Sequence, residues 1–483
     1  MGDSGPTQVR WRSGPGDDKR DMSIRHLFLP RLAIRQTGPG WLGLGVGLGL
    51  GGLLLPGLSL AQNHTTSAST PARLASAAAP QSGQIELSLK QVLDAAAQNF
   101  DVAVARRGVA AAQADVVAAD HAPLPILSAK AGSIDLQNGI GAGPLWQQKR
   151  IDKGVGLDWT WERGNKRSLR TQATQRSAQA AQADLSDTVT LQRILALQAF
   201  YDWLAAQERV EEIKGIALST QALSDAAQRR LQAGDLSAQD ATRTAIEAAR
   251  ARADAQQADL ERQRAALVLS QLTALSGNPL LWRARAEWPD QGARPDALQD
   301  ATARLDDLIE QRPDVQAARE RVAAAQASLQ LARAQKSSDL TWGGSIDHFP
   351  GTSTRQVELR LQMPLQWGYG FEGEIARAAA LQDQAQDLLE RIRLGARTEL
   401  QGLLQDWETS LVRLQAYEQD ILPRARQVAQ QAELAYSQGA LTLTDLLDAR
   451  RTLRATRIES VAARAAVAKA QGAWDVRTAP RQP

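Results

Sequence analysis

The 483-residue chain contains no cysteine and few aromatic residues. Without cysteine, disulfide bonds, thiolate nucleophiles, cysteine-ligated metals and acyl-thioether anchors are excluded. Phe, Trp and Tyr make up 4% of the residues, and there are three methionines. A chain so poor in aromatic residues, yet rich in alanine, glutamine and arginine, favours long solvated helices with a narrow apolar stripe over a thick globular core.

Histidine is also scarce, and no arrangement of catalytic residues is recognisable. After the N-terminal leader described below, His64, His121 and His348 are widely separated. No H-E-x-x-H helix, phosphate-binding P-loop or nucleophile elbow occurs. His121 at a helix end and His348 near a hairpin tip are expected to be exposed loop residues. We therefore expect no enzyme activity, no cofactor and no metal site.

The N-terminus has the pattern of an export signal. Three arginines between residues 25 and 35 precede the apolar run Trp41–Leu60, and small residues suited to a signal peptidase end at Ala61. We expect a cleaved leader at 1–61, a flexible linker at 62–85, and no lipid anchor. Met22 is an alternative start, and a permanent anchor helix is the alternative to cleavage. Removing the leader balances the acidic and basic residues, so charge gives no reason to expect nucleic-acid binding.

The stretch VAAAQA occurs twice, within DVAVARRGVAAAQA from Asp101 and within DVQAARERVAAAQA from Asp314. Each copy is followed by two alternating segments, a long helical stretch, a glycine-containing turn and a further helix. The alternating segments predict strands at about 126–137, 151–161, 339–348 and 356–363. The helical stretches predict helices at Ser88–His121, Lys166–Gln232, Pro313–Lys336 and Glu374–Gln438. The chain thus divides into repeat 1 (86–280), a linker (281–302), repeat 2 (303–476) and a tail (477–483).

The predicted strands have the alternation and the length, about ten residues, of transmembrane β-strands. Five tryptophans lie at or beside strand ends, where an interfacial aromatic girdle would place them: Trp146, Trp159, Trp161, Trp342 and Trp367. Four strands cannot close a barrel, and an open sheet edge is not tolerated in lipid, so several chains would share one barrel. The hairpin tips, Asn138–Arg150 and Pro350–Arg355, would then face the cell exterior, because the long polar helices cannot cross the bilayer. Two hairpins packed on a soluble core are the alternative.

Three stretches of the sequence indicate a known protein family. They are RPDV at Arg312–Val315, LRLQMPLQWGYGFEGEIARA at Leu359–Ala378, and AYSQGALTLTDLLDARRTL at Ala435–Leu453. They resemble a helix opening, a strand-to-helix phrase and a helical turn of the TolC family of trimeric outer-membrane channel proteins. The phrase GNKR at Gly164–Arg167 resembles the CzcC-like branch of that family, which is associated with heavy-metal cation efflux. Phe100 departs from the pattern, because many members have proline there.

The resemblance implies an α+β membrane protein, in which a trimer forms a 12-stranded transmembrane β-barrel continued by an α-helical periplasmic barrel. Such a protein is the passive exit duct of a tripartite efflux or type I secretion system in the outer membrane of a Gram-negative bacterium. Its expected partners are two further copies, outer-membrane lipid, a periplasmic adaptor protein and an inner-membrane pump of the RND or ABC type. The cargo stays open between drugs, metal cations and proteins. An exported coiled-coil structural or adhesin-like protein without a pore is the alternative, which the two matched hairpins disfavour.

Two helix turns are candidate docking sites. The first turn is Ala233–Ser237 and the second turn is Gln438–Thr442, each at the end of a long helix and each with a glycine that lets the chain reverse. We expect them to dock the adaptor through Gly234, Leu236, Gly439 and Leu441.

A candidate gate follows the second turn. Asp445 and Asp448 are spaced i, i+3, which puts both carboxylates on one helix face. The resemblance implies that they ring the periplasmic entrance and that Tyr436 helps to hold it closed. Repeat 1 offers Asp235 and Asp240 at a different spacing, so the ring is expected from repeat 2 only. The alternative is that both carboxylates are solvated and pair with the arginines at 450 and 451.

Overall fold

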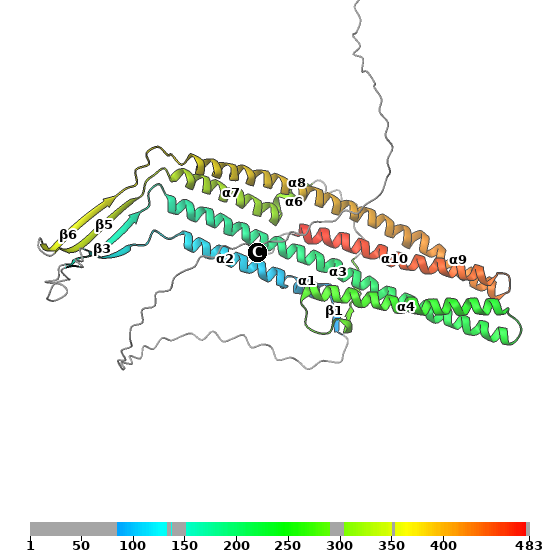
Figure 1. The fold of residues 1–483 in the computed structure, drawn as a ribbon. Helices are drawn as coiled ribbons and strands as arrows, with labels where there is room; N and C mark the ends of the chain where they lie inside the picture. The colour runs from blue at the N-terminus through cyan, green and yellow to red at the C-terminus, as the bar shows by residue number, and fades with distance from the viewer. Residues whose placement is uncertain (1–84, 133–136, 138–150, 290–303, 350–352, 480–483) are drawn as a thin grey trace, which may run out of the picture. The chain divides into compact units, whose positions relative to one another are not determined.

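The computed structural model describes residues 85–132, 137, 151–289, 304–349 and 353–479 (Figure 1). Its elements follow one another as two copies of a helical segment, a β-hairpin, a long helix, a turn and a further helix. The expected leader, the linker up to residue 84 and Trp146 lie outside the described residues. The expected tip at 138–150 and residues 350–352 of the other tip lie outside them as well.

Four antiparallel strands form one sheet in the order β2, β3, β5, β6. They are β2 (Ile126–Gly132), β3 (Asp152–Trp161), β5 (Leu340–Phe349) and β6 (Ser353–Gln362). Each coincides largely with a strand that the alternating pattern predicts. The first is described only to Gly132, and β6 begins earlier than predicted.

The alternation of the sequence gives the sheet two chemically different faces. Apolar side chains lie opposite one another across the strands of one face, as in the row formed by Val155, Ile346 and Val357. All three are exposed in the single chain. The other face carries glycine, serine, threonine and charged residues. The apolar face therefore has no covering layer among the described residues, which is a costly arrangement in water.

On the polar face, an aspartate lies over a glycine of the neighbouring strand. Asp347 of β5 is opposite Gly154 of β3. Its side chain is fully buried, and its carboxylate binds Lys130 Nζ of β2 at 2.8 Å and accepts a hydrogen bond from Ser345 Oγ at 2.6 Å. A side chain at position 154 would occupy the space that the carboxylate fills.

The same two strands contain a second aspartate–glycine pair, in which the aspartate belongs to β3 and the glycine to β5. Asp158 of β3 is opposite Gly343 of β5, and its carboxylate binds Arg360 Nη2 of β6 at 3.2 Å. A Cβ at position 343 would collide with that carboxylate. Both aspartates thus lie against the sheet, each paired with a cation from an outer strand.

Long helices follow both hairpins. Repeat 1 contains α2 (Phe100–Ala119), α3 (Lys166–Gln232) and α4 (Ala238–Thr273). Repeat 2 contains α7 (Pro313–Ala334), α8 (Glu372–Ala416), α9 (Leu422–Ser437) and α10 (Leu443–Thr478). At 1.5 Å per residue, the 67 residues of α3 span about 100 Å. Because α3 packs along α2, α4, α7 and α10, this one helix joins the two repeats (Figure 1).

The prediction of one helix over Ser88–His121 is wrong. The segment forms α1 (Leu89–Ala96) and then α2. The break arises because the side chain of Asn99 accepts a hydrogen bond from Val102 N–H at 3.0 Å and so caps a new helix. Phe100 takes the first helical position, which is the position that tolerates proline best.

The sequence pattern predicts one continuous helix over Glu374–Gln438, whereas the structure contains a π-helical turn at Tyr417–Ile421. Pro423 follows this turn, has no N–H to donate, and would place its ring against the carbonyl one turn earlier in a regular α-helix. The wider π turn accommodates this change, so that the chain continues as α9. The sequence of α3 contains no proline, and α3 is unbroken.

A buried apolar cluster surrounds the middle of α3. Phe200, Trp203 and Leu204 are fully buried there. Two short parallel strands, β1 (Ile85–Leu87) and β4 (Trp282–Ala284), contribute to the cluster. β4, preceded by the short helix η1 (Pro279–Leu281), lies in the segment expected to be a linker, and α6 (Leu305–Gln311) opens repeat 2. Residues 290–303 of the expected linker lie outside the described residues.

A cluster of buried ion pairs also joins the repeats. Arg477 of α10 binds Asp187 of α3 at 2.6 Å and Glu399 of α8 at 3.0 Å. Arg312, just before α7, binds Asp314 at 2.8 Å and the same Glu399 at 2.7 Å. Burial raises the pKa of Asp187 despite Arg477. Burial also acts on Asp314, but the hydrogen bonds and charge of Arg312 outweigh it and hold the pKa of Asp314 below its usual value.

Replacing Gly154 by alanine should weaken the sheet, because the new Cβ would collide with the carboxylate of Asp347 and with the Lys130 side chain. We expect a loss of about 1–3 kcal/mol, as in other overpacked sites, measured as a lower unfolding temperature of the purified protein. Gly344→Ala is the matched control, because the nearest atom to its Cβ would be Leu359 Cδ2 at 3.9 Å. Adding Asp347→Ala should restore stability to the Gly154→Ala variant. Equal unfolding temperatures for Gly154→Ala and Gly344→Ala would contradict this account.

Candidate functional site

The two helix turns have the same backbone geometry. Gly234 has φ 83° and Gly439 has φ 78°, both in the left-handed region that glycine adopts without strain. The next residue, Asp235 or Ala440, donates its N–H back to a carbonyl of the last helical turn at 2.9 Å. This closure satisfies the end of the long helix and reverses the chain. The sequence predicts both reversals correctly from their glycines.

The helix after each turn is capped in the same way. In repeat 1, Ser237 Oγ accepts a hydrogen bond from Asp240 N–H at 3.1 Å and donates one to the Asp240 carboxylate at 2.8 Å. In repeat 2, Thr442 and Asp445 make the same two hydrogen bonds at 3.3 and 2.6 Å. Asp240 is therefore the structural counterpart of Asp445, a correspondence that the spacing of the acidic residues hides.

Asp448 has no such counterpart. Three residues after Asp240, the corresponding position of α4 is Arg243. Asp448 is exposed, and its carboxylate lies 3.3 Å from Arg451 Nη1. Arg451 also contacts Glu247 of α4. Within one chain Asp448 is thus a solvated, paired carboxylate, as the alternative to the gate expects, while the Asp445 carboxylate accepts a hydrogen bond from the N-cap residue Thr442.

The remaining candidate residues of the turns differ in exposure. Gly234 and Gly439 are exposed, and Leu236, Leu441 and Tyr436 are partly buried. Arg450 does not bind either candidate gate carboxylate and instead lies 2.8 Å from Glu433 of α9. Neither turn is therefore sealed within the chain, so both surfaces are reachable by another molecule.

Contacts between the repeats hold the two turns together. Arg243 of α4 donates a hydrogen bond to Thr444 Oγ1 at the start of α10, at 3.2 Å. Further along α10, Arg454 binds Asp254 of α4 at 2.6 Å. The first and second turns therefore form one composite surface, although Arg243 and Thr444, which join them, are 201 positions apart in sequence.

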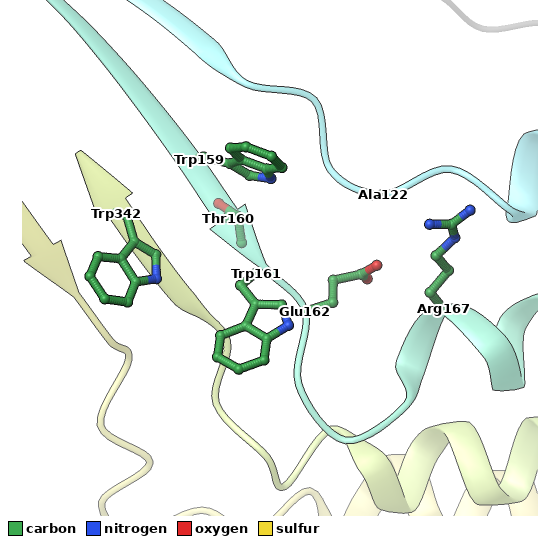
Figure 2. A pocket seen from close by; sticks show the side chains of 7 residues that line it. All are labelled: Ala122, Trp159, Thr160, Trp161, Glu162, Arg167 and Trp342. Atoms are coloured by element: carbon green, nitrogen blue, oxygen red, sulfur yellow. The ribbon is translucent and has the colours of Figure 1, made fainter. Parts of the chain in front are cut away.

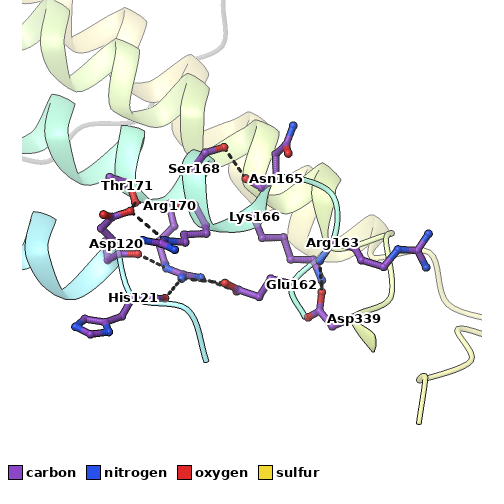
Figure 3. A network of polar contacts seen from close by, with 12 residues as sticks. Asp120, His121, Glu162, Arg163, Asn165, Lys166, Ser168, Arg170, Thr171 and Asp339 are labelled. Carbon is purple, nitrogen blue, oxygen red and sulfur yellow. Dashed lines mark hydrogen bonds and ion pairs between the residues drawn. The ribbon is translucent and has the colours of Figure 1, made fainter. Parts of the chain in front are cut away.

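The GNKR phrase forms the turn from β3 into α3. Gly164 has φ 73° and Asn165 has φ 56°, so two successive residues lie in the left-handed region. This turn buries the side chain of Lys166, whose Nζ lies 2.8 Å from Asp339 Oδ1 just before β5. The N–H of Arg163 donates to the same oxygen at 3.0 Å (Figure 3). The phrase therefore anchors the first long helix to the second hairpin.

Two arginines fix the other side of this junction. Arg167 Nε lies 3.1 Å from Asp120 Oδ1, and this hydrogen bond, reinforced by the arginine charge, lowers the pKa of Asp120. Arg170 binds Glu162 at 2.9 Å and donates to the backbone carbonyl of His121 at 2.8 Å (Figure 3). His121 is exposed, as the sequence predicts.

Three of the five expected girdle tryptophans lie together at one end of the sheet. Trp159 and Trp161 belong to β3, and Trp342 of β5 is the cross-strand partner of Trp159. They line an open pocket of about 460 Å³ (Figure 2). Trp367 follows β6 and is highly exposed.

Some chemical features are missing from the described part of the chain. No helix there is long and apolar enough to span a membrane. No group of three or more histidine and carboxylate side chains in that part is placed to hold a metal ion. The expectation that His348 is an exposed loop residue is wrong, because β5 extends to Phe349 and His348 is buried within it.

Comparison with known proteins agrees with this geometry. Residues 305–473 match the family described as "Outer membrane efflux protein". The chain is 28% identical over 437 residues to the cobalt-zinc-cadmium resistance protein CzcC of Cupriavidus metallidurans, and the match covers 90% of this chain and 95% of that protein.

Solved structures share the fold. A membrane protein from Pseudomonas aeruginosa superimposes with a TM-score of 0.68 at 18% identity, over 81% of this chain and 92% of that chain. The CmeC outer-membrane channel of Campylobacter jejuni gives a TM-score of 0.66 at 15% identity, over 81% and 85%. At such low identities the likeness shows the fold alone, which is the α+β fold of TolC-like channels with long helices.

The family match and the extended similarity to CzcC confirm the resemblance that the sequence motifs indicate. This is a family of channels and not of enzymes. The similarity to the TolC family of outer-membrane efflux proteins, which extends along nearly the whole chain, identifies it as an outer-membrane efflux channel.

Proposed function

We propose that three copies of this chain form one duct, with a 12-stranded barrel in the outer membrane and an α-helical barrel in the periplasm. The observation that carries this proposal is the sheet with an uncovered apolar face and two edge strands, β2 and β6. Lipid would cover the apolar face, and the edges of neighbouring copies would pair, so that no backbone group meets hydrocarbon unpaired.

The long helices support the same assembly. Large apolar side chains stay exposed on them in the single chain, as at Leu218 of α3 and at Leu394 and Val412 of α8. Helices with a narrow apolar stripe are stabilised by packing against further helices. In the proposed trimer, neighbouring copies supply those helices.

The proposed orientation places both hairpin tips outside the cell and both helix turns in the periplasm. The turns lie at the opposite ends of α3 and of the α8–α9 helix from the strands. They would dock a periplasmic adaptor, which links the duct to an inner-membrane pump of the RND or ABC type. The duct would be passive, because the pump supplies the energy.

We assign divalent heavy-metal cations as the cargo. The support is the similarity, along nearly the whole chain, to a protein named for cobalt, zinc and cadmium resistance. The pump would select the ion, and the duct would provide the exit route.

The cargo assignment predicts a metal phenotype. Deleting the gene should lower tolerance to Co²⁺, Zn²⁺ and Cd²⁺ severalfold, and the full chain supplied in trans should restore it. Tolerance to dyes and hydrophobic antibiotics serves as the control and should stay unchanged. A deletion strain that loses dye tolerance and keeps metal tolerance would show that the duct serves a drug pump.

Docking at the turns predicts that Leu236→Asp and Leu441→Asp abolish metal tolerance, because a charge in a partly buried apolar contact is costly. The amount of trimer in the outer membrane should not change. Ser219→Asp, at an exposed position of α3 away from the turn, is the matched control and should keep tolerance. Normal tolerance in both leucine variants would remove the docking assignment.

We further propose that Asp445 and Asp448 of three chains ring the periplasmic entrance and that Tyr436 holds it closed. Both carboxylates are exposed and follow the second turn on one helix face. Six carboxylates around one axis attract multivalent cations. Repeat 1 would contribute the opposite charge at the corresponding position, because Arg243 replaces Asp448 there.

The ring predicts that multivalent cations block conductance in planar bilayers. The Asp445→Asn, Asp448→Asn double variant should raise the half-blocking concentration by at least about tenfold, which corresponds to about 1.4 kcal/mol. Asp240→Asn changes the counterpart of Asp445 in repeat 1, which bonds to the N-cap residue Ser237, and should leave the block unaltered. Undiminished block in the double variant, with normal trimer yield, would place the entrance elsewhere.

A further inference from the structure

The pocket at the end of the sheet is apolar on one side. Trp159, Trp161 and Trp342 line it, and their exposed fractions are 61%, 61% and 57%. Ala122, from the connection between α2 and β2, lies across from the tryptophans (Figure 2). At about 460 Å³ the pocket has the size of ordinary ligand sites. Leaving these exposed tryptophan side chains in contact with water alone would be unfavourable.

The other side of the pocket is polar. Arg167, from the first turn of α3, together with Glu162 and Thr160, completes its lining (Figure 2). The carboxylate of Glu162 is held by Arg170. Arg167 is half exposed, and its only ion-pair partner among the described residues is the more exposed Asp120. A cation is therefore available where the tryptophans end.

We propose that this pocket binds one phospholipid of the periplasmic leaflet, with the phosphate on Arg167 and an acyl chain along Trp161 and Trp342. The apolar wall continues the uncovered face of the sheet, which would meet hydrocarbon. The cation lies at the first turn of a helix that leaves the membrane, the level at which headgroups lie. This inference rests on the proposed placement of the sheet in the bilayer.

The pocket differs from a general aromatic girdle, because it has a defined polar end. Trp367 is also highly exposed beside a strand end, but it does not line this pocket. Arg163 belongs to the same junction but does not line the pocket either. These two residues are matched controls for Trp161 and Arg167.

Asp120 makes the proposal sharper. Its Oδ1 atom lies 3.1 Å from Arg167 Nε. The carboxylate therefore competes with a lipid phosphate for the same guanidinium donor. Removing that competitor should strengthen phospholipid binding, whereas removing the arginine should weaken it. A purely structural role of the Arg167–Asp120 pair would give losses in both variants.

The test is native mass spectrometry of the purified full chain, delipidated in detergent and titrated with phosphatidylglycerol. Arg167→Gln should reduce the lipid-bound fraction by about fivefold, because one arginine near an anionic lipid is worth about that factor. Trp161→Ala should reduce it comparably, and Trp161→Phe should retain most of it. Asp120→Asn should increase it, and Trp367→Ala and Arg163→Gln should leave it unchanged.

Two further arms identify the source of the phosphate. Inorganic phosphate at millimolar concentration should not displace the lipid, and diacylglycerol should bind more weakly than phosphatidylglycerol. Equal retention in Arg167→Gln and Arg163→Gln, or equal loss in Trp161→Ala and Trp367→Ala, would overturn the inference. The mass of the protein assembly in the same samples distinguishes failure of the phospholipid proposal from failure of the trimeric duct. A trimer without selective lipid binding overturns only this inference, and a monomer overturns the proposed duct.

Discussion

A sheet of four strands with one apolar face and two unpaired edges is not stable by itself in water or in lipid. In water, the row of Val155, Ile346 and Val357 would remain exposed. In lipid, the edge strands β2 and β6 would lack backbone partners. In the proposed trimer, lipid would cover the apolar row and neighbouring copies would pair the edge strands, so both demands would be met. The helices must leave the sheet in a direction that lets neighbouring copies meet along their length.

That direction is set at the junction between strands and helices. The two left-handed residues Gly164 and Asn165 turn the chain, and the buried Lys166 binds Asp339 of the other repeat. One ion pair thus ties the first long helix to the second hairpin. Exposed ion pairs contribute little, typically 0–1 kcal/mol, but removing one partner of a buried pair leaves an uncompensated charge. Breaking such a pair by removing one partner is therefore expected to destabilise the junction between the repeats.

The extent to which the sequence predicts this structure depends on periodicity. Strands of ten residues with strict alternation, and helices ended by Gly234 and Gly439, carry strong local signals, so their positions follow from sequence. The strands β1 and β4 have three residues each and no readable period, and their pairing depends on contacts between distant segments. The π turn before Pro423 was also missed, because a proline in a helical pattern can end the helix, kink it or widen one turn. Local sequence does not distinguish these outcomes.

The repeats share a backbone but differ in charge, and that difference bears on function. Both turns close with the same hydrogen bonds, and both following helices use an aspartate at the same capped position. At the next position on that helix face, however, repeat 1 has Arg243 and repeat 2 has Asp448. The backbone of the turn is thus a common scaffold, and charge can change on it without a change of fold. In the proposed ring of three chains, arginines of repeat 1 and aspartates of repeat 2 would alternate around the axis, and the charges nearest the axis would contribute most to the field that a departing cation meets.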